Sequence, residues 1–180
     1  MKLTWSHCVM YVRDLDATIA FYDEMLGFKV SDRGPLIPGN DELQVAFLTQ
    51  SGSDHHQIAF ANARSGDAPS TTLDHIAFRV ESLDDVKEMA ARLTEDGRAT
   101  DIGAVNHGNA WSCYFRDPEG NRIEVFTDSP FHVKQPQIDG WDFAMSEAEL
   151  KKATEEHYGP EPGFQPMDQY REAQAKKFGG

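Results

Sequence analysis

Basic side chains, cysteines and long apolar runs are all scarce in this sequence of 180 residues. Lys and Arg number 17 against 30 Asp and Glu, which gives a net charge of −13 at pH 7. Such a surplus of negative charge repels nucleic acid and anionic membrane surfaces, so neither is expected as a partner. No apolar run reaches the length of a membrane-spanning helix, and the first residues lack the apolar core of a secretory signal. The predicted compartment is the cytoplasm.

The two cysteines, Cys8 and Cys113, each lie in an apolar, strand-like run. Buried, reduced thiols are therefore expected rather than a disulfide framework. Hydrophobic residues make up 39% of the chain and charged residues 26%, a composition typical of a folded globular protein. The length suits one domain with its own core.

Two stretches of the chain match each other in outline, one beginning at His7 and the other at His75. Each starts with a histidine in a short apolar strand and then enters a helix. Asp14 and Ser82 stand at the N-cap positions. Apolar residues recur at helical spacing in both copies, namely Leu15, Ile19, Tyr22, Leu26 and Leu83, Val86, Ala90, Leu93. Gly27 and Gly97 follow as helix stops.

Strand patterns follow each predicted helix. They cover residues 45–50 and 56–60 in the first copy and 111–116 and 122–127 in the second, where the turn Asp117-Pro118-Glu119-Gly120 joins the last two. Residues 30–44 and 61–72 are rich in Gly, Pro, Ser and Asp and are interpreted as loops. The sequence thus predicts an α+β fold of two paired βαβββ modules that form a curved sheet.

The alternation of side chains along a strand shows which residues share a face. In the first strand of each copy the histidine lies opposite the apolar packing residues, so His7 and His75 share the other face. Glu124 takes the same orientation between Ile123 and Val125. The three side chains are therefore expected to project into one concavity.

Two imidazoles and one carboxylate on separate strands are the ligand set of a facial triad, which leaves three metal positions open. The competing interpretation is two core histidines bonded to the backbone and a glutamate in an ion pair. Matching places in a repeat favour the metal site. The ligand types alone also suit Mn, Zn or Ni.

The motifs DHIAFRV and FRDPEGNRIEVF, within the paired modules, resemble the vicinal oxygen chelate superfamily of glyoxalase, bleomycin resistance and extradiol dioxygenase proteins. The resemblance is nearest to the one-domain type I extradiol catechol dioxygenases and extends over residues 5–128. It implies that His7, His75 and Glu124 bind Fe(II), with Mn(II) as a possible substitute. It also implies a small catechol substrate and O₂ as the reaction partners, and we expect a homo-oligomer.

The resemblance assigns three further roles. His56, in the run HHQIA, corresponds to the acid/base histidine of the family, and His107 and Tyr114 correspond to residues that contact the substrate. Strict strand alternation would instead turn His55 toward the site, unless a bulge lies at the start of the strand. The family usually has Gly-Arg where Val105-Asn106 stand here.

Position 59 separates two chemistries within the superfamily. Aligning residues 57–59 with 122–124 places Ala59 at the position equivalent to Glu124. In proteins similar to glyoxalase I, a fourth metal ligand, which is a glutamate, occupies that position. Alanine supplies no lone pair, so the resemblance favours ring cleavage with O₂. A Lewis-acid isomerase or lyase and a non-enzymatic drug-binding module are the alternatives.

The predicted domain covers residues 1–128, with modules of about 1–66 and 67–128, and residues 129–180 form a C-terminal tail. Ser146-Glu147-Ala148-Glu149 is a capping box that predicts a helix to about residue 157. Four aromatic residues of the tail indicate that it packs against another part of the protein or against a partner. They are Phe131, Trp141, Phe143 and Phe164. The tail could pack on its own domain, form an oligomer interface or cover the pocket as a lid, and the sequence leaves these three alternatives open.

Overall fold

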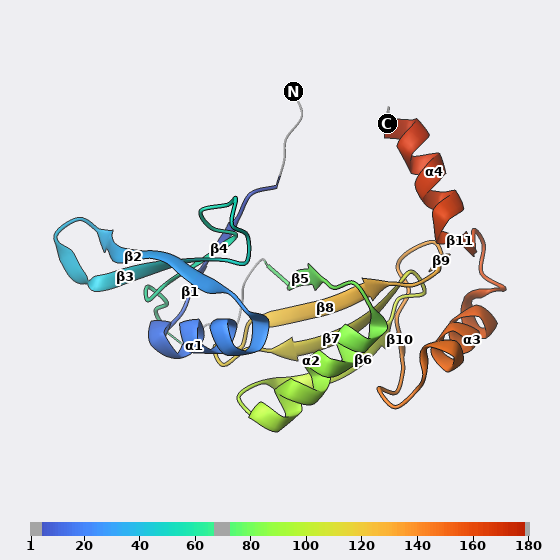
Figure 1. Ribbon diagram of the computed structural model, residues 1–180, viewed down its shortest axis with the longest axis horizontal. Helices are drawn as coiled ribbons and strands as arrows, with labels where there is room; N and C mark the ends of the chain where they lie inside the picture. The colour runs from blue at the N-terminus through green and yellow to red at the C-terminus, as the bar shows by residue number, and fades with distance from the viewer. Residues whose placement is uncertain (1–4, 67–72, 179–180) are drawn as a thin grey trace. The chain divides into compact units, whose positions relative to one another are not determined.

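The computed structural model describes residues 5–66 and 73–178 and divides into two compact units. The first unit comprises residues 1–74 and 116–121, and the second comprises residues 75–115 and 122–180. Figure 1 shows the elements of each unit along the chain. Of the predicted loop at 61–72, residues 67–72 lie outside the described residues.

The first unit is a four-stranded sheet in the order β1-β4-β3-β2, and helix α1 contacts three of its strands. Strand β1 pairs with β4 in parallel, whereas β2, β3 and β4 pair in antiparallel fashion. The elements are β1 Cys8–Tyr11, α1 Leu15–Leu26, β2 Lys29–Ile37, β3 Asn40–Thr49 and β4 Ile58–Ala61.

The second unit repeats this order of elements in a five-stranded sheet, β10-β6-β7-β8-β5. Strand β5 pairs with β8 in parallel, as β1 pairs with β4. The elements are β5 Ile76–Arg79, α2 Leu83–Asp96, β6 Thr100–Asn106, β7 Ala110–Arg116, β8 Arg122–Asp128 and the short β10 Asp139–Gly140. The prediction of two βαβββ modules in an α+β fold is confirmed.

Both predicted helices begin and end where their sequence signals lie. The Asp14 side chain accepts a hydrogen bond from the Ala17 amide, and Ser82 forms a complete capping box with Asp85. Gly27 and Gly97 close the helices in the left-handed region, each with φ of 75°. All four apolar residues predicted on α2 are buried.

The prediction of a loop over residues 30–44 is wrong, because this stretch forms β2 and the beginning of β3. The two strands make a long hairpin that turns at Pro38-Gly39. Strand β2 lies at the edge of its sheet and most of its side chains are exposed, so it lacks the apolar alternation of a half-buried strand. Two shifts in its register with β3 further obscure the pattern.

The turn between β7 and β8 clusters with the first unit. Its Glu119 is buried and accepts hydrogen bonds from the backbone amides of Arg13 and Asp14, at 2.9 and 2.8 Å, and from the Arg64 guanidinium. Asp117 accepts a hydrogen bond from the Tyr22 hydroxyl at 3.2 Å, and burial raises the pKa of the Asp117 carboxyl. The turn therefore fixes the entry to α1.

The tail packs against the second unit through apolar and polar contacts. Its elements are β9 Phe131–His132, α3 Glu147–Tyr158, β11 Gln165–Pro166 and α4 Met167–Phe178. Leu150 of α3 joins Leu83 and Trp111 in a buried cluster, with Trp141 packed against it. Arg171 of α4 forms an ion pair with Asp128.

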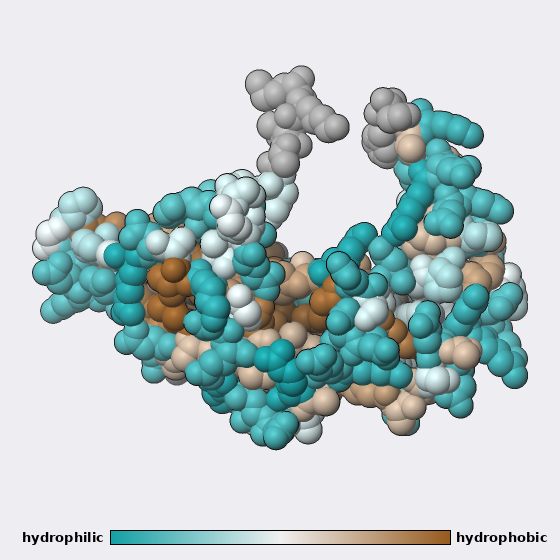
Figure 2. Space-filling view, viewed as in Figure 1, coloured by the Kyte–Doolittle hydropathy of each residue, from teal (hydrophilic) through white to brown (hydrophobic). Residues whose placement is uncertain are grey.

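The surface of the tail is mainly polar on the face seen in Figure 2, where α4 is largely hydrophilic. Among residues 5–66 and 73–178, no helix combines the length and the apolar character that crossing a bilayer requires.

Replacing Glu119 with Ala should lower the free energy of unfolding by about 3 kcal/mol, because two backbone amides and the Arg64 guanidinium lose their acceptor. Glu119→Gln keeps an acceptor oxygen and should cost only about 1 kcal/mol. Urea denaturation measures both values, with the exposed Glu95→Ala as the control. Wild-type stability in Glu119→Ala would contradict this role.

Candidate metal site

The predicted site residues fall into two groups according to their unit. His7 and His56 belong to the first unit, and His75, His107, Tyr114 and Glu124 belong to the second. Each group has its own internal geometry.

In the second unit, a histidine and a glutamate lie together on paired strands. His75 immediately precedes β5, Glu124 lies in β8, and the Nε2 atom of His75 is 3.3 Å from Oε2 of Glu124. The other carboxylate oxygen, Oε1, accepts a hydrogen bond of 2.6 Å from the hydroxyl of Ser112 in β7. Glu124 and Ser112 are buried, so this carboxylate is fixed from two sides.

Next to this pair lie His107 and Tyr114. The Tyr114 hydroxyl is 3.1 Å from Nε2 of His107, and the Tyr114 ring meets the His75 ring edge-on, with centroids 5.5 Å apart. The Arg122 guanidinium lies 4.4 Å from the centroid of the Tyr114 ring, a cation–π arrangement. The second unit thus brings together four of the six residues predicted from the sequence.

Ser112 and Arg122 are the residues near Glu124 that the sequence analysis missed. Both could have been found by strand alternation, because Ser112 is two residues before Tyr114 and Arg122 is two residues before Glu124. Neither forms part of the ligand pattern by itself. A serine in a buried strand becomes informative only when its cross-strand neighbour is known.

In the first unit, the rings of His7 and His56 are in contact, with centroids 4.3 Å apart. Nδ1 of His7 is 3.0 Å from the hydroxyl of Ser6, which leaves Nε2 as the nitrogen for a metal. The exposed His55 lies near Asp32, with His55 Nε2 and an Asp32 carboxylate oxygen 3.9 Å apart. The histidine beside His7 is therefore His56.

The expected conflict between His55 and His56 disappears because β4 begins only at Ile58. Both histidines precede the strand, so its alternation does not govern them and no bulge is needed. The pKa of the His56 imidazole is lowered, first by partial burial and then by the neighbouring His7 and His55. A lowered pKa favours the neutral ring, which can accept a proton.

Ala59 and Glu124 occupy equivalent positions in the two sheets. In the parallel pair β1–β4, Ala59 lies opposite Val9, two residues after His7. In the parallel pair β5–β8, Glu124 lies opposite Ala77, two residues after His75. Ala59 is fully buried and offers no donor atom. The equivalence inferred from the sequence alignment is thus reproduced in the register of both sheets.

The donor atoms of the second unit fit a divalent metal. Two ligands bound about 2.1 Å from a metal at a right angle are roughly 3 Å apart, close to the 3.3 Å between His75 and Glu124. Ser112 bonds the Glu124 carboxylate and Ser6 bonds the His7 ring, and hydrogen bonds of this kind orient the ligands in known metal sites. Within the described part of the chain, no three His, Cys, Asp or Glu side chains converge as one ligand group. The three-residue ligand set stays a prediction.

The cysteines do not contribute to this chemistry. Cys8 and Cys113 are free thiols, as expected from the sequence. Burial raises the pKa of the Cys113 thiol to about 12 and also raises the pKa of Cys8. Both therefore remain protonated at neutral pH and are poor metal ligands.

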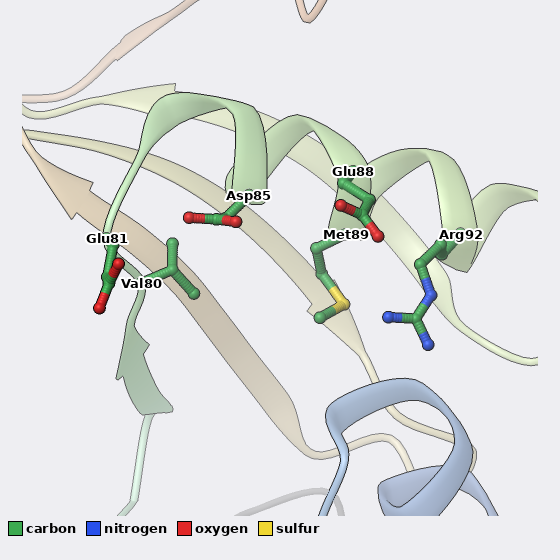
Figure 3. A pocket seen from close by; sticks show the side chains of 6 residues that line it. All are labelled: Val80, Glu81, Asp85, Glu88, Met89 and Arg92. Carbon is green, nitrogen blue, oxygen red and sulfur yellow. The ribbon is translucent and has the colours of Figure 1, made fainter.

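A hollow on helix α2 contains none of the predicted site residues. Figure 3 shows its lining, which comes from α2 and the segment before it: Val80, Glu81, Asp85, Glu88, Met89 and Arg92. The Asp85 carboxylate is engaged in the cap of α2, where it accepts bonds from the amide and hydroxyl of Ser82. The hollow has neither histidine nor cysteine, and the candidate chemistry lies on the strands.

Two βαβββ units, each with a histidine directly before its first strand, and Glu124 within β8 define a glyoxalase-like protein with a candidate metal site. The family model for the Glyoxalase/Bleomycin resistance protein/Dioxygenase superfamily matches residues 4–125. The chain belongs to this superfamily.

Two curated relatives are similar to much of this chain, and the second is a dioxygenase by name. Metapyrocatechase of Pseudomonas sp. (strain CF600) is 28% identical over 139 residues, which are 76% of this chain and 43% of the relative. Biphenyl-2,3-diol 1,2-dioxygenase 3 of Rhodococcus globerulus is 30% identical over 129 residues, which are 69% of this chain and 63% of the relative. The chain thus spans about two fifths and somewhat under two thirds of these relatives.

Among solved structures, the fosfomycin resistance protein FosX of Listeria monocytogenes, complexed with Mn(II) and sulfate, is similar in fold. The TM-score is 0.54 at 20% identity, and the match covers 72% of this chain and 95% of that chain.

Replacing Ser112 with Ala should weaken the binding of a divalent metal about 10- to 100-fold, because the Glu124 carboxylate loses the hydrogen bond that orients it. Titration with Mn(II) in a calorimeter measures the affinity. Ser65→Ala, at an exposed serine of the first unit, is the control and should bind as the wild type does. Equal affinities in both variants would remove Ser112 from the site.

Proposed function

We propose that this chain is an Fe(II)-dependent extradiol dioxygenase that opens catechol-type rings with O₂. The ligands in this proposal are His7, His75 and Glu124. The observation that carries it is the group in the second unit, where His75 and Glu124 lie beside the His107–Tyr114 pair. The name of one relative, biphenyl-2,3-diol 1,2-dioxygenase 3, supports the same class of reaction.

The reaction joins one catechol to one O₂. The carbon–carbon bond next to the diol breaks and both oxygen atoms enter the product, a muconic semialdehyde-type compound, so the atoms balance. Bound Fe(II) would acidify the diol and pass electron density from it to O₂. Because Ala59 offers no donor, the proposed site would have three protein ligands and would keep open positions for both reactants.

The side chains around the ligands perform the proton transfers and the positioning. His56, whose lowered pKa favours the neutral ring, is suited to take a proton from the diol and return it later to a developing oxygen anion. The Tyr114 hydroxyl would hydrogen-bond a substrate oxygen, and the neighbouring His107 would orient the substrate.

The assay that tests this proposal starts from metal-free protein, loaded with one equivalent of Fe(II) without oxygen. Catechol and a panel of aryl-, alkyl- and carboxyl-substituted catechols are then added in oxygenated buffer. We expect one O₂ to be consumed per catechol, with a yellow product. Iron binding without O₂ uptake would instead support a Lewis-acid isomerase or lyase, and a chain that retains no metal would support a drug-binding module.

Replacing His56 with Phe should reduce ring cleavage by about 10²–10⁴, because the general acid/base is lost while the proposed iron ligands remain. His55→Phe is the comparison, because His55 is exposed beside Asp32 and reaches the site only through its Nδ1, 2.9 Å from Nδ1 of His56, so its replacement should reduce cleavage much less. Steady-state rates with catechol, at equal iron content, compare the two. A larger loss of cleavage in His55→Phe than in His56→Phe would show that His55, and not His56, is the acid/base residue.

Replacing Ala59 with Glu should place a carboxylate at the position equivalent to Glu124 and convert the site toward four ligands. The extra negative charge attracts the cation strongly in a low-dielectric cavity, so metal affinity should hold or rise while ring cleavage falls. Iron content and O₂ uptake measure the two effects. Wild-type cleavage with normal iron content would show that position 59 does not reach the metal.

A further inference from the structure

We infer that the tail segment around Gln135 is a positioning element of the site, which sets the tautomer of His107 and thereby the direction of its hydrogen bond with Tyr114. The positioning residue is Gln135, and it acts through the backbone carbonyl of Gln137. Its effect on catalysis rests on the proposed function, but its effect on the His107 ring does not.

The tautomer follows from the partner of each ring nitrogen. Nδ1 of His107 is 2.7 Å from the backbone oxygen of Gln137, and a carbonyl oxygen can only accept. Nδ1 therefore carries a proton. In the neutral ring Nε2 is then an acceptor, and the Tyr114 hydroxyl, 3.1 Å away, donates to it.

Gln135 holds this carbonyl against His107. Its side-chain oxygen accepts a hydrogen bond of 3.0 Å from the Gln137 amide, and its Nε2 donates to the His107 backbone oxygen at 2.8 Å. The Nε2 atom of Gln135 also donates to the Val133 carbonyl at 3.3 Å. One side chain thus joins the backbone of His107 to the segment that carries its Nδ1 acceptor.

The backbone next to His107 is held separately, by helix α3. Asn106 bonds with the Thr154 hydroxyl at 2.9 Å, its carbonyl accepts from the Tyr158 hydroxyl, and its side-chain oxygen accepts from the Gly108 amide. Gly108 has φ of 77°, and a Cβ there would collide with Val133. Because these contacts do not involve the imidazole, loss of Gln135 should free the ring while leaving the turn in place.

The test compares Gln135→Ala with the wild type by ¹⁵N NMR of the histidine rings, using the full chain without added metal. We expect the wild-type His107 signals to show the Nδ1-protonated tautomer and Gln135→Ala to show a mixture with the Nε2-protonated form. In an iron-loaded assay the variant should lose about 10-fold in kcat. Ile138→Ala, in the same segment with a side chain that is 74% exposed, is the control for both readouts.

A second variant guards against a general loss of folding. Gln135→Glu keeps the acceptor for the Gln137 amide but loses the donor to His107, so its tautomer ratio should lie between those of the wild type and Gln135→Ala. A wild-type Nε2-protonated ring, or an unchanged tautomer in both variants, would overturn the inference. If the tautomer shifts but no variant and no wild type cleaves catechol, the positioning role stands and the proposed function fails.

Discussion

The hydrogen bond from Ser112 to Glu124 is the interaction on which the candidate site depends. A buried carboxylate is costly unless its oxygens are paired, and here Ser112 satisfies one oxygen while the other lies 3.3 Å from the His75 ring. The serine is on β7 and the glutamate on β8, so the position of the carboxylate is set by sheet pairing. Regular secondary structure, rather than a loop, thus holds the proposed ligand.

The two units share the same strand register but carry different residues at the equivalent position. Each unit places a histidine just before the first strand of a parallel pair. The residue two positions after that histidine lies opposite one residue of the partner strand. That residue is Glu124 in the second unit and Ala59 in the first. The proposed distinction between a three-ligand oxygenase site and a four-ligand Lewis-acid site therefore depends on one side chain in a repeated framework.

The C-terminal tail contacts the strands that carry the proposed site residues of the second unit, as well as the core of that unit. Thr154 accepts hydrogen bonds from the side chains of both Asn106 and Trp111, so α3 is bonded to the residue before His107 and to the strand that carries Ser112 and Tyr114. The aromatic residues of the tail, read from the sequence as a sign of packing, include Trp141, which bonds the backbone of Ser112. Through these contacts a tail outside the paired modules would act on the proposed site.

Much of this could be predicted from the sequence because local signals and the repeat agree. The caps at Asp14 and Ser82 and the buried face of α2 were predicted correctly, since each depends on residues near in sequence, and the fold was predicted from the repeat and the family resemblance. Strand β2 was missed because an edge strand has no buried alternation. Strand alternation places Ser112 on the face of Tyr114, but its bond to Glu124, like the contacts of Gln135, arises from a partner that only the folded chain brings close.

The most direct test of the central claim, that His7, His75 and Glu124 bind one metal, is a crystal structure of the iron-loaded chain with anomalous scattering recorded at the iron edge. The account predicts a single strong anomalous peak, within about 2.0–2.3 Å of a nitrogen of each histidine and an oxygen of Glu124. A peak bound to His75 and Glu124 without His7, or a fourth protein ligand at the metal, would contradict it.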